Sequence, residues 1–428
     1  MYECCAGSVR FSRLYFGCRM TWTQQTHAII NMTTTFIVDS GKYSKKYALF
    51  NEGVCMWSVG FESSDVGYVV HERGIDSQQS CRAADQSEFA NAFSFAFDQV
   101  QACIKKYRLD DVTEVVIKIS VPGTLFQQHC LITADYEAEL KKREAISPQH
   151  IRLVLRELAQ CRRSFPDAEL FAASDSAFHA TMPRYAREYS LSLDSIRSLD
   201  LYRFGVDGLS VSSVVGRIHS IIGIDPERMV VCHINNDGAS VTAVHKGVSI
   251  DTTAGFAPTS GFPSRTYAGD VDASTLLRIM KSKNLNATEA ELFLSTQGGF
   301  QTVTGSSDMN SVLKQASQND EQATHSLQLF TYKTQQAIAA AAAALGGFDA
   351  LVFTGCVGVR SSELRAMILE TLTFLDLQIN EERNSATMES GGVISQRNSG
   401  VKVVVLKGDE LSELNAVVKK VQLSTTKN

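Results

Sequence analysis

The 428-residue sequence lacks the cysteine patterns that mark zinc sites and disulfide frameworks. Its ten cysteines include no C-x-x-C pair and no spacing typical of metal ligands. This absence argues against a structural zinc ion. In a chain of this length it predicts free thiols, most of them buried, in a reducing compartment. We therefore expect a cytoplasmic protein.

Long apolar runs and basic blocks are also missing. The most apolar stretch, residues 337–353, is interrupted by Gly346 and Gly347, and it falls short of the roughly 18 uninterrupted apolar residues of a membrane span. Lysine and arginine gather only in short runs such as 141–143, and the formal net charge is −5. We therefore expect neither a membrane-spanning segment nor a nucleic-acid partner.

The first 31 residues lack the apolar core of a secretory signal peptide. Their three arginines and single glutamate are faintly typical of a transit peptide, while an upstream extension ahead of Met32 fits equally well. We expect residues 1–31 to be a disordered N-terminal extension outside the fold.

One pattern is present twice, about 200 residues apart, in a chain long enough for two domains. Residues 36–50 read as strand, Asp-x-Gly turn and strand, and residues 229–253 repeat this with an Asp-Gly turn. Glycine beside an acidic residue lets backbone amides close around phosphate oxygens, while the carboxylate can hold a hydrated metal ion. Two such hairpins facing one another predict a nucleoside triphosphate site and phosphoryl transfer.

Periodicity predicts a mixed α/β chain with two similar halves. The predicted strands are residues 35–40, 46–51, 55–60, 113–121, 168–173, 228–234, 350–354 and 401–406. The predicted helices are residues 86–107, 149–164, 272–283, 287–296, 307–317, 320–346 and 361–375, with a closing helix from about 409. A glycine turn is expected between 354 and 361. Asp175 follows a strand, and open α/β sheets bind ligands at the carboxyl ends of their strands, so we expect Asp175 to serve chemistry.

Three segments, in this order, resemble the acetate kinase family, within the wider fold of actin, hexokinase and the heat-shock chaperone ATPases. They are SDSAFHATMPRYAREYSL at 174–191, SIDTTAGFAPTSGFPSRTYAGDVDA at 249–273 and ALVFTGCVGVRSSELR at 350–365. The resemblance runs from Phe36 to the last helix. It implies an α/β chain of two duplicated domains with the actin/hexokinase-like (ribonuclease H-like) ATPase fold and a nucleotide cleft between them.

The resemblance also implies boundaries, partners and a reaction. The half-domains would be residues 32–180 and 181–395, with residues 396–428 returning to the first. The reaction would move the γ-phosphoryl of ATP onto acetate or a similar short-chain carboxylate in a direct in-line step that needs Mg²⁺. A homodimer is the family's usual assembly.

The family's functional positions map onto this chain residue by residue. The resemblance implies catalytic roles for Asp175, Lys118, Asp207 and Arg265, and magnesium ligands at Asp39 and Glu410. The implied ATP/ADP-binding residues are Asp39, Gly41, Ser44, Lys46, Asn236, Asp237, Gly238, Ser240, Gly355 and Gly358.

The departures from the family pattern cluster at the chemistry. Lys118 stands where the family has its substrate-binding Arg, and Asp207 where it has the transition-state His. The second active-site Arg falls on Tyr267, with Arg265 two residues earlier. An anion near a transferring phosphoryl group should repel it, and each lost charge-stabilising group typically costs about 10²–10³ in turnover. Such losses need not add.

Other departures affect nucleotide contacts. Asp39 replaces an Asn, Lys42 replaces a Ser, and Val359-Arg360 replaces the Glu-Asn of the adenosine loop. The second hairpin, residues 233–240, is one residue longer than the family's, which leaves the roles of His233 and Asn236 open. His179, among apolar neighbours, is expected to be structural.

Three hypotheses remain open. The first is an active carboxylate kinase with a rearranged clamp, in which Lys42, Lys45 and Arg265 supply cations from new positions. The second is a nucleotide-binding but catalytically degenerate member of the family. The third retains phosphoryl transfer with a changed acceptor.

Overall fold

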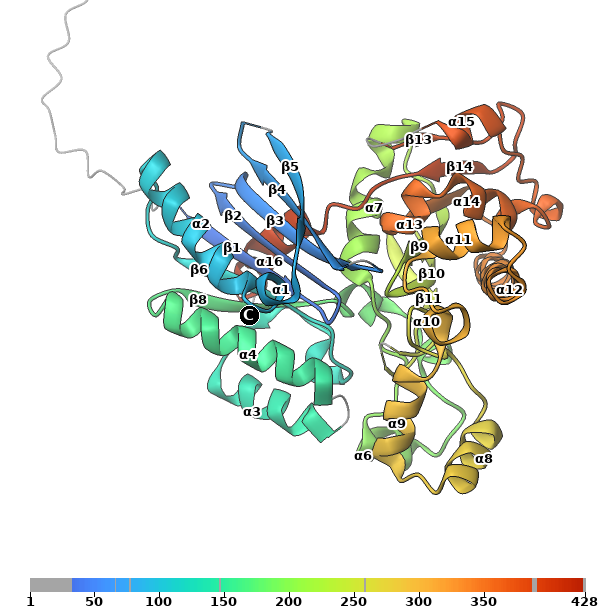
Figure 1. The fold of residues 1–428 in the computed structure, drawn as a ribbon, viewed down its shortest axis with the longest axis horizontal. Helices are drawn as coiled ribbons and strands as arrows, with labels where there is room; N and C mark the ends of the chain where they lie inside the picture. Colours follow the sequence, from blue (N-terminus) through green and yellow to red (C-terminus); the bar gives the residue numbers. More distant parts are fainter. Residues whose placement is uncertain are drawn as a thin grey trace, which may run out of the picture. The chain divides into compact units, whose positions relative to one another are not determined.

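The computed structural model describes residues 33–65, 67–76, 78–145, 148–257, 259–386 and 391–425 (Figure 1). The expectation for residues 1–31 lies outside the described residues.

The first half of the chain builds an eight-stranded sheet in the order β5-β4-β3-β2-β1-β6-β8-β7. Its strands are β1 (Thr34–Ser40), β2 (Ser44–Asn51), β3 (Val54–Ser64), β4 (Gly67–Gly74), β5 (Gln79–Ala84), β6 (Glu114–Ile119), β7 (Cys130–Leu131) and β8 (Glu169–Ser174). The β1–β2–β3 meander is antiparallel, whereas β1, β6 and β8 run parallel. Parallel strands need crossover connections, which the helices of this half supply.

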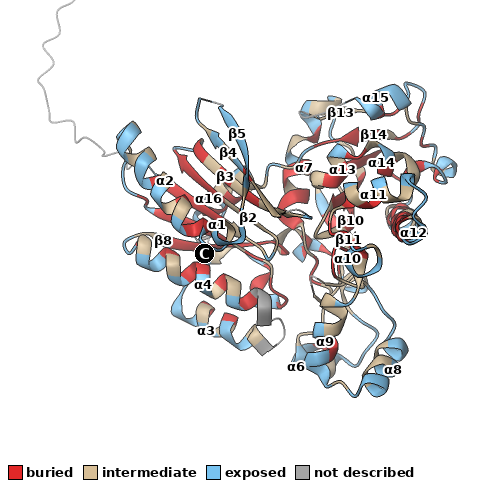
Figure 2. Cartoon of the chain, in the orientation of Figure 1, coloured by how far each residue is buried: buried red, intermediate tan, exposed pale blue. Residues whose placement is uncertain are grey.

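Helices cover both faces of this sheet, which explains why its central strands are continuously apolar. The helices of this half are α1 (Gln86–Ala90), α2 (Ala92–Tyr107), α3 (Ala134–Lys142) and α4 (Pro148–Ser164). The face that carries Phe36 and Val38 packs on α2 and α4 (Figures 1 and 2). The opposite face, with Ile37, packs on the last helix α16 (Glu410–Thr425), which supplies Leu414 and Val417.

The second half builds a six-stranded sheet in the order β11-β10-β9-β12-β14-β13. Its strands are β9 (Arg228–Asn235), β10 (Gly238–His245), β11 (Val248–Thr252), β12 (Ala350–Thr354), β13 (Gly392–Val393) and β14 (Lys402–Val405). The helices between β8 and β13 are α5 (Arg184–Arg187), α6 (Leu193–Leu199), α7 (Gly208–Ile222), α8 (Ala273–Lys283), α9 (Ala287–Thr296), α10 (Gly299–Thr304), α11 (Met309–Ser317), α12 (Glu321–Leu345), α13 (Gly355–Arg360), α14 (Ser362–Leu369) and α15 (Glu381–Ser385). One face of β9 packs on α12 and α14, and the other packs on α7.

The two halves repeat one topology. In each, an antiparallel meander, β1 to β5 in the first half and β9 to β11 in the second, leads through helices to two parallel strands. These strands lie beside the first strand of the meander: β6 and β8 after β1, and β12 and β14 after β9. The two hairpins predicted from the sequence are therefore β1–β2 and β9–β10.

Several predicted elements need correction. The helix expected over 86–107 is divided at Asn91 into α1, whose N-terminus Asp85 caps, and α2. The expected glycine turn after β12 is the short helix α13, and the helix expected over 361–375 ends at Leu369. The sequence predicts only a polar helical stretch without bounds ahead of β9. It does not delimit α7, because the Ser-, Val- and Gly-rich sequence of this helix has a low helix propensity.

The predicted thiols are free but not mostly buried. Among the seven described cysteines only Cys161 and Cys232 are buried, and Cys81 is exposed. His179 is fully buried, with its ring nitrogens against Ser249 Oγ and the Val206 carbonyl, as expected for a structural histidine.

The backbone at Gly355 makes the joint between β12 and α13 sensitive to a single methyl group. Its φ of +82° is left-handed, and an added Cβ would lie 2.4 Å from the Ile234 carbonyl oxygen. Gly223 has a similar φ of +77° but nothing within 4 Å of an added Cβ. We expect Gly355→Ala to lower the free energy of unfolding by about 3 kcal/mol and Gly223→Ala by about 1 kcal/mol. Urea denaturation measures both, and equal losses would contradict a steric role for Gly355.

Candidate active site

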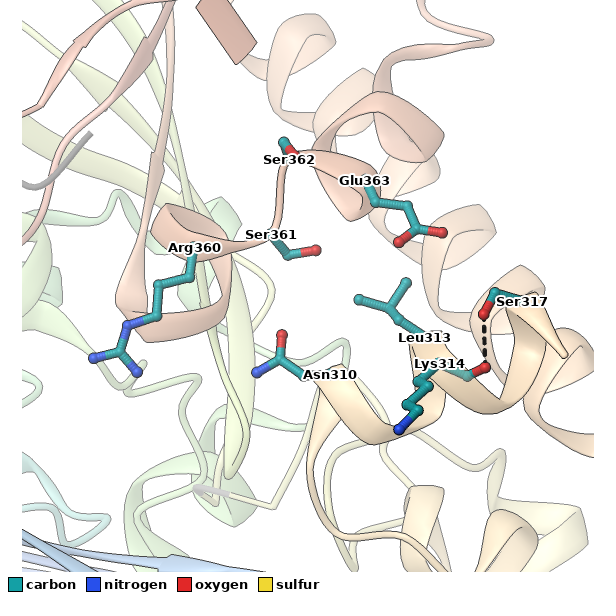
Figure 3. Close-up of a pocket in the computed structure, with 8 residues that line it drawn as sticks. All are labelled: Asn310, Leu313, Lys314, Ser317, Arg360, Ser361, Ser362 and Glu363. Atoms are coloured by element: carbon teal, nitrogen blue, oxygen red, sulfur yellow. Dashed lines mark hydrogen bonds between the residues drawn. The ribbon is translucent and has the colours of Figure 1, made fainter. Parts of the chain in front are cut away.

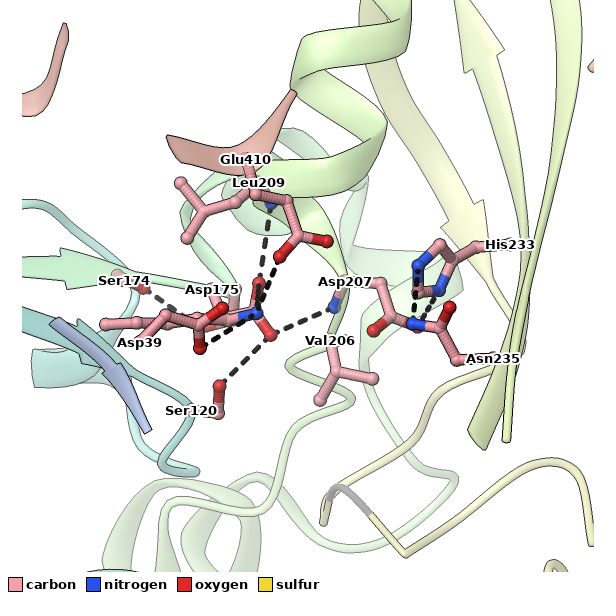
Figure 4. A network of polar contacts seen from close by, with 12 residues as sticks. Asp39, Ser120, Ser174, Asp175, Val206, Asp207, Leu209, His233, Asn235 and Glu410 are labelled. Carbon is pink, nitrogen blue, oxygen red and sulfur yellow. Dashed lines mark hydrogen bonds and ion pairs between the residues drawn. The ribbon is translucent and has the colours of Figure 1, made fainter. Parts of the chain in front are cut away.

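The carboxyl ends of the first sheet's central strands bring together two lysines and three acidic side chains. Lys118 Nζ lies 3.9 Å from Asp39 Oδ1, 3.7 Å from Asp175 Oδ1 and 3.6 Å from Glu410 Oε2. Lys46 Nζ lies 4.0 Å from Asp39 Oδ2 and 3.7 Å from the same Glu410 oxygen. These contacts form one network, part of which Figure 4 draws.

Strand periodicity explains why these side chains meet. Side chains alternate between the faces of a strand, and Asp39 follows Ile37 by two residues, so both face α16. Lys46 is paired with Asp39 across the hairpin. Lys118 and Asp175 lie two residues beyond Val116 and Ala173, which pack on the same face. Glu410 begins the helix that covers that face.

Asp175 is buried and hydrogen-bonded from two directions. Its Oδ2 accepts hydrogen bonds from Ser120 Oγ at 3.0 Å and from the Asp207 backbone N–H at 3.2 Å (Figure 4). Burial raises the pKa of Asp175, and the charge of Lys118 opposes that rise. An added Cβ at Gly208 would lie 2.4 Å from the Asp175 carbonyl oxygen, so only glycine permits this close approach.

Asp207 directs its carboxylate toward the second sheet. Its Oδ2 accepts a hydrogen bond from Ser240 Oγ at 2.7 Å and lies 3.1 Å from His233 Nδ1. Burial alone would raise the pKa of Asp207, but the charge of His233 and the hydrogen bond from Ser240 lower it to about 2. The anion at position 207 is therefore neutralised locally by β9 and β10.

His233 is held from behind by a short chain of polar contacts. Its Nε2 lies 3.2 Å from Asn235 Nδ2, and Asn235 Oδ1 accepts from the Cys356 backbone N–H at 2.7 Å. That second bond fixes the amide so that its NH₂ group faces Nε2, and the neutral ring therefore carries its proton on Nδ1, toward Asp207. Burial lowers the pKa of His233, but Asp207 outweighs burial and the pKa is raised.

The second hairpin meets the first through Arg265. The guanidinium lies 4.3 Å from the centre of the Tyr43 ring, at the β1–β2 corner, and its Nη1 lies 3.9 Å from Asp237 Oδ1, at the β9–β10 corner. Its Nη2 donates to Ser63 Oγ at 3.2 Å and to Ser307 Oγ at 2.7 Å. Among the described residues Asp237 is the only carboxylate within 4.0 Å of Arg265, so Arg265 lies at the hairpin corners and outside the Lys118 cluster.

The remaining residues predicted to bind the nucleotide lie either at the two hairpin corners or in α13. Asn236 Oδ1 accepts from the Met309 backbone N–H at 3.2 Å, so this side chain anchors α11. An added Cβ at Gly238 would meet nothing within 4 Å, which leaves open space over that corner. Gly41 closes the first corner, its N–H donating to the Ser44 carbonyl at 2.7 Å. Gly355 and Gly358 lie in α13.

Like Arg265, the other two cations expected to reach the site from new positions do not join the Lys118 cluster. Lys42 is exposed, with its Nζ 4.8 Å from the Tyr43 ring centre. Lys45 is buried on the opposite face of the hairpin, 4.0 Å from Glu157 Oε1. The prediction for Lys45 is wrong because adjacent residues of a strand face opposite sides.

A pocket of about 350 Å³ lies beside α11 and α13 (Figure 3). It is lined by Asn310, Leu313, Lys314, Ser317, Arg360, Ser361, Ser362 and Glu363. Arg360 is the residue that replaces the Asn of the family's adenosine loop. The pocket lining is largely polar.

Asp39 and Glu410 fit a magnesium ion that is partly held by other groups. Each keeps 15% of its side chain exposed, and each lies within 4.0 Å of Lys46 Nζ and Lys118 Nζ. Among the described residues no group of three or more His, Cys, Asp or Glu side chains could hold a metal ion. Mg²⁺ in phosphoryl-transfer sites typically takes one or two carboxylates, with water and substrate phosphates as its other ligands. The donor set is consistent with that arrangement.

Sequence reasoning missed Ser120 and left His233 without a role. Ser120 could have been found, since it lies two residues beyond Lys118 and faces the same side. The contact of His233 with Asp207 joins separate elements, β9 and the start of α7, and no local pattern shows it.

Two sheets that repeat one topology, each with helices on both faces, define an α/β fold of the actin/hexokinase-like class. The family model described as "Acetokinase family" matches residues 34–415, and the chain belongs to this family. Both the resemblance and the fold class predicted from the sequence are thereby confirmed. Membership supports ATP-dependent phosphorylation of a carboxylate, with magnesium, in general terms.

Individual relatives agree. The chain is 29% identical to an acetate kinase of Clavibacter michiganensis, over 90% of this chain and 98% of that protein. The structure of Porphyromonas gingivalis acetate kinase superposes with a TM-score of 0.75 at 26% identity, covering 91% of this chain and all of that one. A propionate kinase from Francisella tularensis has the same fold, with a TM-score of 0.79 at 24% identity over 91% of this chain and all of that one. Within the described residues, no helix is both long and apolar enough to span a bilayer.

The Asp207–His233 contact predicts a measurable titration. Asp207→Asn removes the charge that opposes burial, so we expect the pKa of His233 to fall below its ordinary value of 6.5. Because the wild-type pKa is raised, the pair's contribution to stability is complete below about pH 6.5 and is lost as pH rises through the His233 pKa. The variant should lack this pH dependence. NMR of the imidazole protons and melting curves against pH measure the two effects.

Asp225→Asn provides the control, since Asp225 lies 3.2 Å from Nδ1 of the exposed His219. It should leave the His233 titration unchanged. An unaltered His233 pKa in Asp207→Asn would show that the two side chains are not coupled.

Proposed function

We propose that the protein is an ATP-dependent kinase that phosphorylates acetate or a similar short-chain carboxylate, by direct in-line transfer with magnesium. The observation that carries this proposal is the position of Lys118. One ammonium group contacts Asp39 and Glu410, the residues that fit the metal, and also Asp175, the acidic residue at the end of β8.

The roles follow from charge and reach. Lys46 and Lys118 would neutralise phosphate oxygens, because they are the cations within 4.0 Å of the acidic cluster. Asp39 and Glu410 would hold magnesium, which when bound supplies further neutralisation of the transferring group. Asp175 is buried and is fixed by hydrogen bonds from Ser120 and the Asp207 N–H. It would orient the acceptor carboxylate for its attack on the phosphoryl group.

Position 207 no longer supplies the family's imidazole, but its anion is not free either. Ser240 and His233 engage one carboxylate oxygen, which reduces repulsion of an incoming phosphoryl group. Lys118 retains the charge of the family's Arg without its bidentate geometry. We therefore infer weaker positioning of the acceptor than an Arg would give.

The nucleotide would lie with its phosphates over the two hairpin corners. The open space at Gly238 and the closed Gly41 corner support this placement. The adenosine end would reach toward α13 and its Gly355 and Gly358, beside the pocket lined by Arg360. A volume of about 350 Å³ is within the usual range for a small-ligand site.

We also propose the two half-domains at residues 32–180 and 181–395, with residues 396–428 returning to the first, a homodimer, and a cytoplasmic location. The packing of α16 on the first sheet supports the returning segment. The assembly rests on family membership alone, whereas the location also rests on the cysteine pattern, which predicts a reducing compartment.

Hydroxylamine trapping tests the activity. Purified protein with ATP, magnesium and acetate should form acetyl hydroxamate, because an acyl phosphate reacts with hydroxylamine. Lys46→Ala should remove most of this product, since one charge-stabilising group is worth about 10²–10³ in turnover. Lys246→Ala, at an exposed turn, is the matched control and should behave like wild type.

The substitutions at 118, 207 and 267 support a second candidate, a nucleotide-binding but catalytically degenerate protein. It predicts that magnesium and ADP raise the melting temperature while no hydroxamate forms with any short acid. Product with other acids but not acetate would instead indicate a changed acceptor. Wild-type product no greater than that of Lys46→Ala, with every acid tried, would refute the kinase proposal.

A further inference from the structure

The β1–β2 hairpin carries charged residues on both of its faces. Asp39 is paired with Lys46, and the next pair toward the corner is Ser40 with Lys45. The first pair faces α16 and the candidate active site. The second pair faces α2 and α4, on the side where Phe36, Val38 and Tyr47 form the core.

A single carboxylate on α4 receives this hidden pair. Glu157, only 1% exposed, accepts a hydrogen bond from Ser40 Oγ at 3.1 Å and another from Tyr47 OH at 3.2 Å. Its Oε1 lies 4.0 Å from Lys45 Nζ, which is itself only 2% exposed. Glu157 therefore contacts both strands of the hairpin, one residue away from Asp39 and from Lys46.

Lys45 is held in place from the other side as well. Its Nζ donates to the Phe89 carbonyl at 3.0 Å and lies 4.9 Å from the Phe89 ring centre. Arg156 approaches Glu157 Oε1 at 3.9 Å from the solvent side. The two buried charges thus have defined partners on α4 and beside α2.

Burying these charges is costly for the fold. Burial raises the pKa of Glu157 and lowers the pKa of Lys45, and each charge only partly offsets the effect on the other. Apolar residues of similar volume often stabilise such a site as well as a buried ion pair does. Stability alone therefore gives no reason for a Glu–Lys–Ser–Tyr cluster here, whereas a directional hold on the hairpin does.

We propose that Glu157 is a positioning residue for phosphate binding. It fixes Ser40 and Lys45 on the hidden face of the β1–β2 hairpin, and so sets where Asp39 and Lys46 lie in the active site. The proposal rests on the proposed role of that hairpin in holding the phosphates of ATP.

The test compares two buried carboxylates that each accept a hydrogen bond from a β1 side chain. Glu157→Gln removes the charge at the phosphate end of the hairpin. Glu114→Gln is the matched control, because Glu114 is 8% exposed and accepts from Thr35 Oγ1 at 2.8 Å at the far end of β1. The measurements are melting temperature, kcat, KM for ATP and KM for acetate, and hydrogen exchange of residues 40–47.

We expect Glu157→Gln to raise KM for ATP about tenfold, which corresponds to the binding free energy of about one charge-assisted hydrogen bond. KM for acetate should stay unchanged. Exchange should become faster at residues 40–47, where Gly41 N–H donates to the Ser44 carbonyl. Glu114→Gln should lower the melting temperature without changing KM for ATP. Glu157→Asp, which retains the charge, should recover part of the ATP affinity.

Two outcomes would overturn the proposal. One is a loss of melting temperature in both variants with no change in KM for ATP. The other is an equal rise of that KM in both. If the wild-type protein forms no acyl phosphate, the kinase proposal fails, and hydrogen exchange then decides the role of Glu157. Faster exchange at residues 40–47 in Glu157→Gln alone would support positioning, and equal exchange in both variants would refute it.

Discussion

The ammonium group of Lys118 is the centre on which the candidate site depends. Three acidic side chains, from β1, from the residue that follows β8 and from the start of α16, approach it within 3.9 Å. Without a cation between them these largely buried carboxylates would repel one another, and their pKa values would rise. Lys118 therefore links the first sheet to the C-terminal helix α16. The packing of the first half and the proposed binding of magnesium and phosphate thus depend on the same residues.

Side chains of the second sheet offset the negative charge of Asp207. An aspartate in place of the family's histidine places a negative charge where phosphoryl transfer requires positive or neutral groups. Asp207 has a left-handed φ of 62° and precedes α7. Its carboxylate meets Ser240 and His233, and His233 is on the α7 face of β9 with Met229 and Val231. The negative charge that Asp207 introduces is thus offset by Ser240 on β10 and His233 on β9.

Most of the fold and part of the site could be predicted from the sequence, and strand periodicity decides which part. Asp39, Lys46, Lys118 and Asp175 share a face because each lies an even number of residues from an apolar residue that packs on α16. The same rule would have placed Lys45 on the hidden face. Contacts between separate elements, such as His233 with Asp207, depend on how helices pack on sheets, which no local pattern specifies. Arg265 belongs to this second kind, since a loop carries it to the hairpin corners.

Under the proposed function, the β1–β2 hairpin must keep its position while several negative phosphate charges act on it. Backbone hydrogen bonds between β1 and β2 fix the register of the hairpin. Here the face turned away from the site carries Ser40 and Lys45, and Glu157 holds both from a helix of the core. The buried charges of Glu157 and Lys45 are then explained by the need to hold Asp39 and Lys46 in place on the opposite face of the hairpin. Each strand carries its functional side chain next to its anchoring one, so a change on the hidden face is transmitted over a single peptide unit.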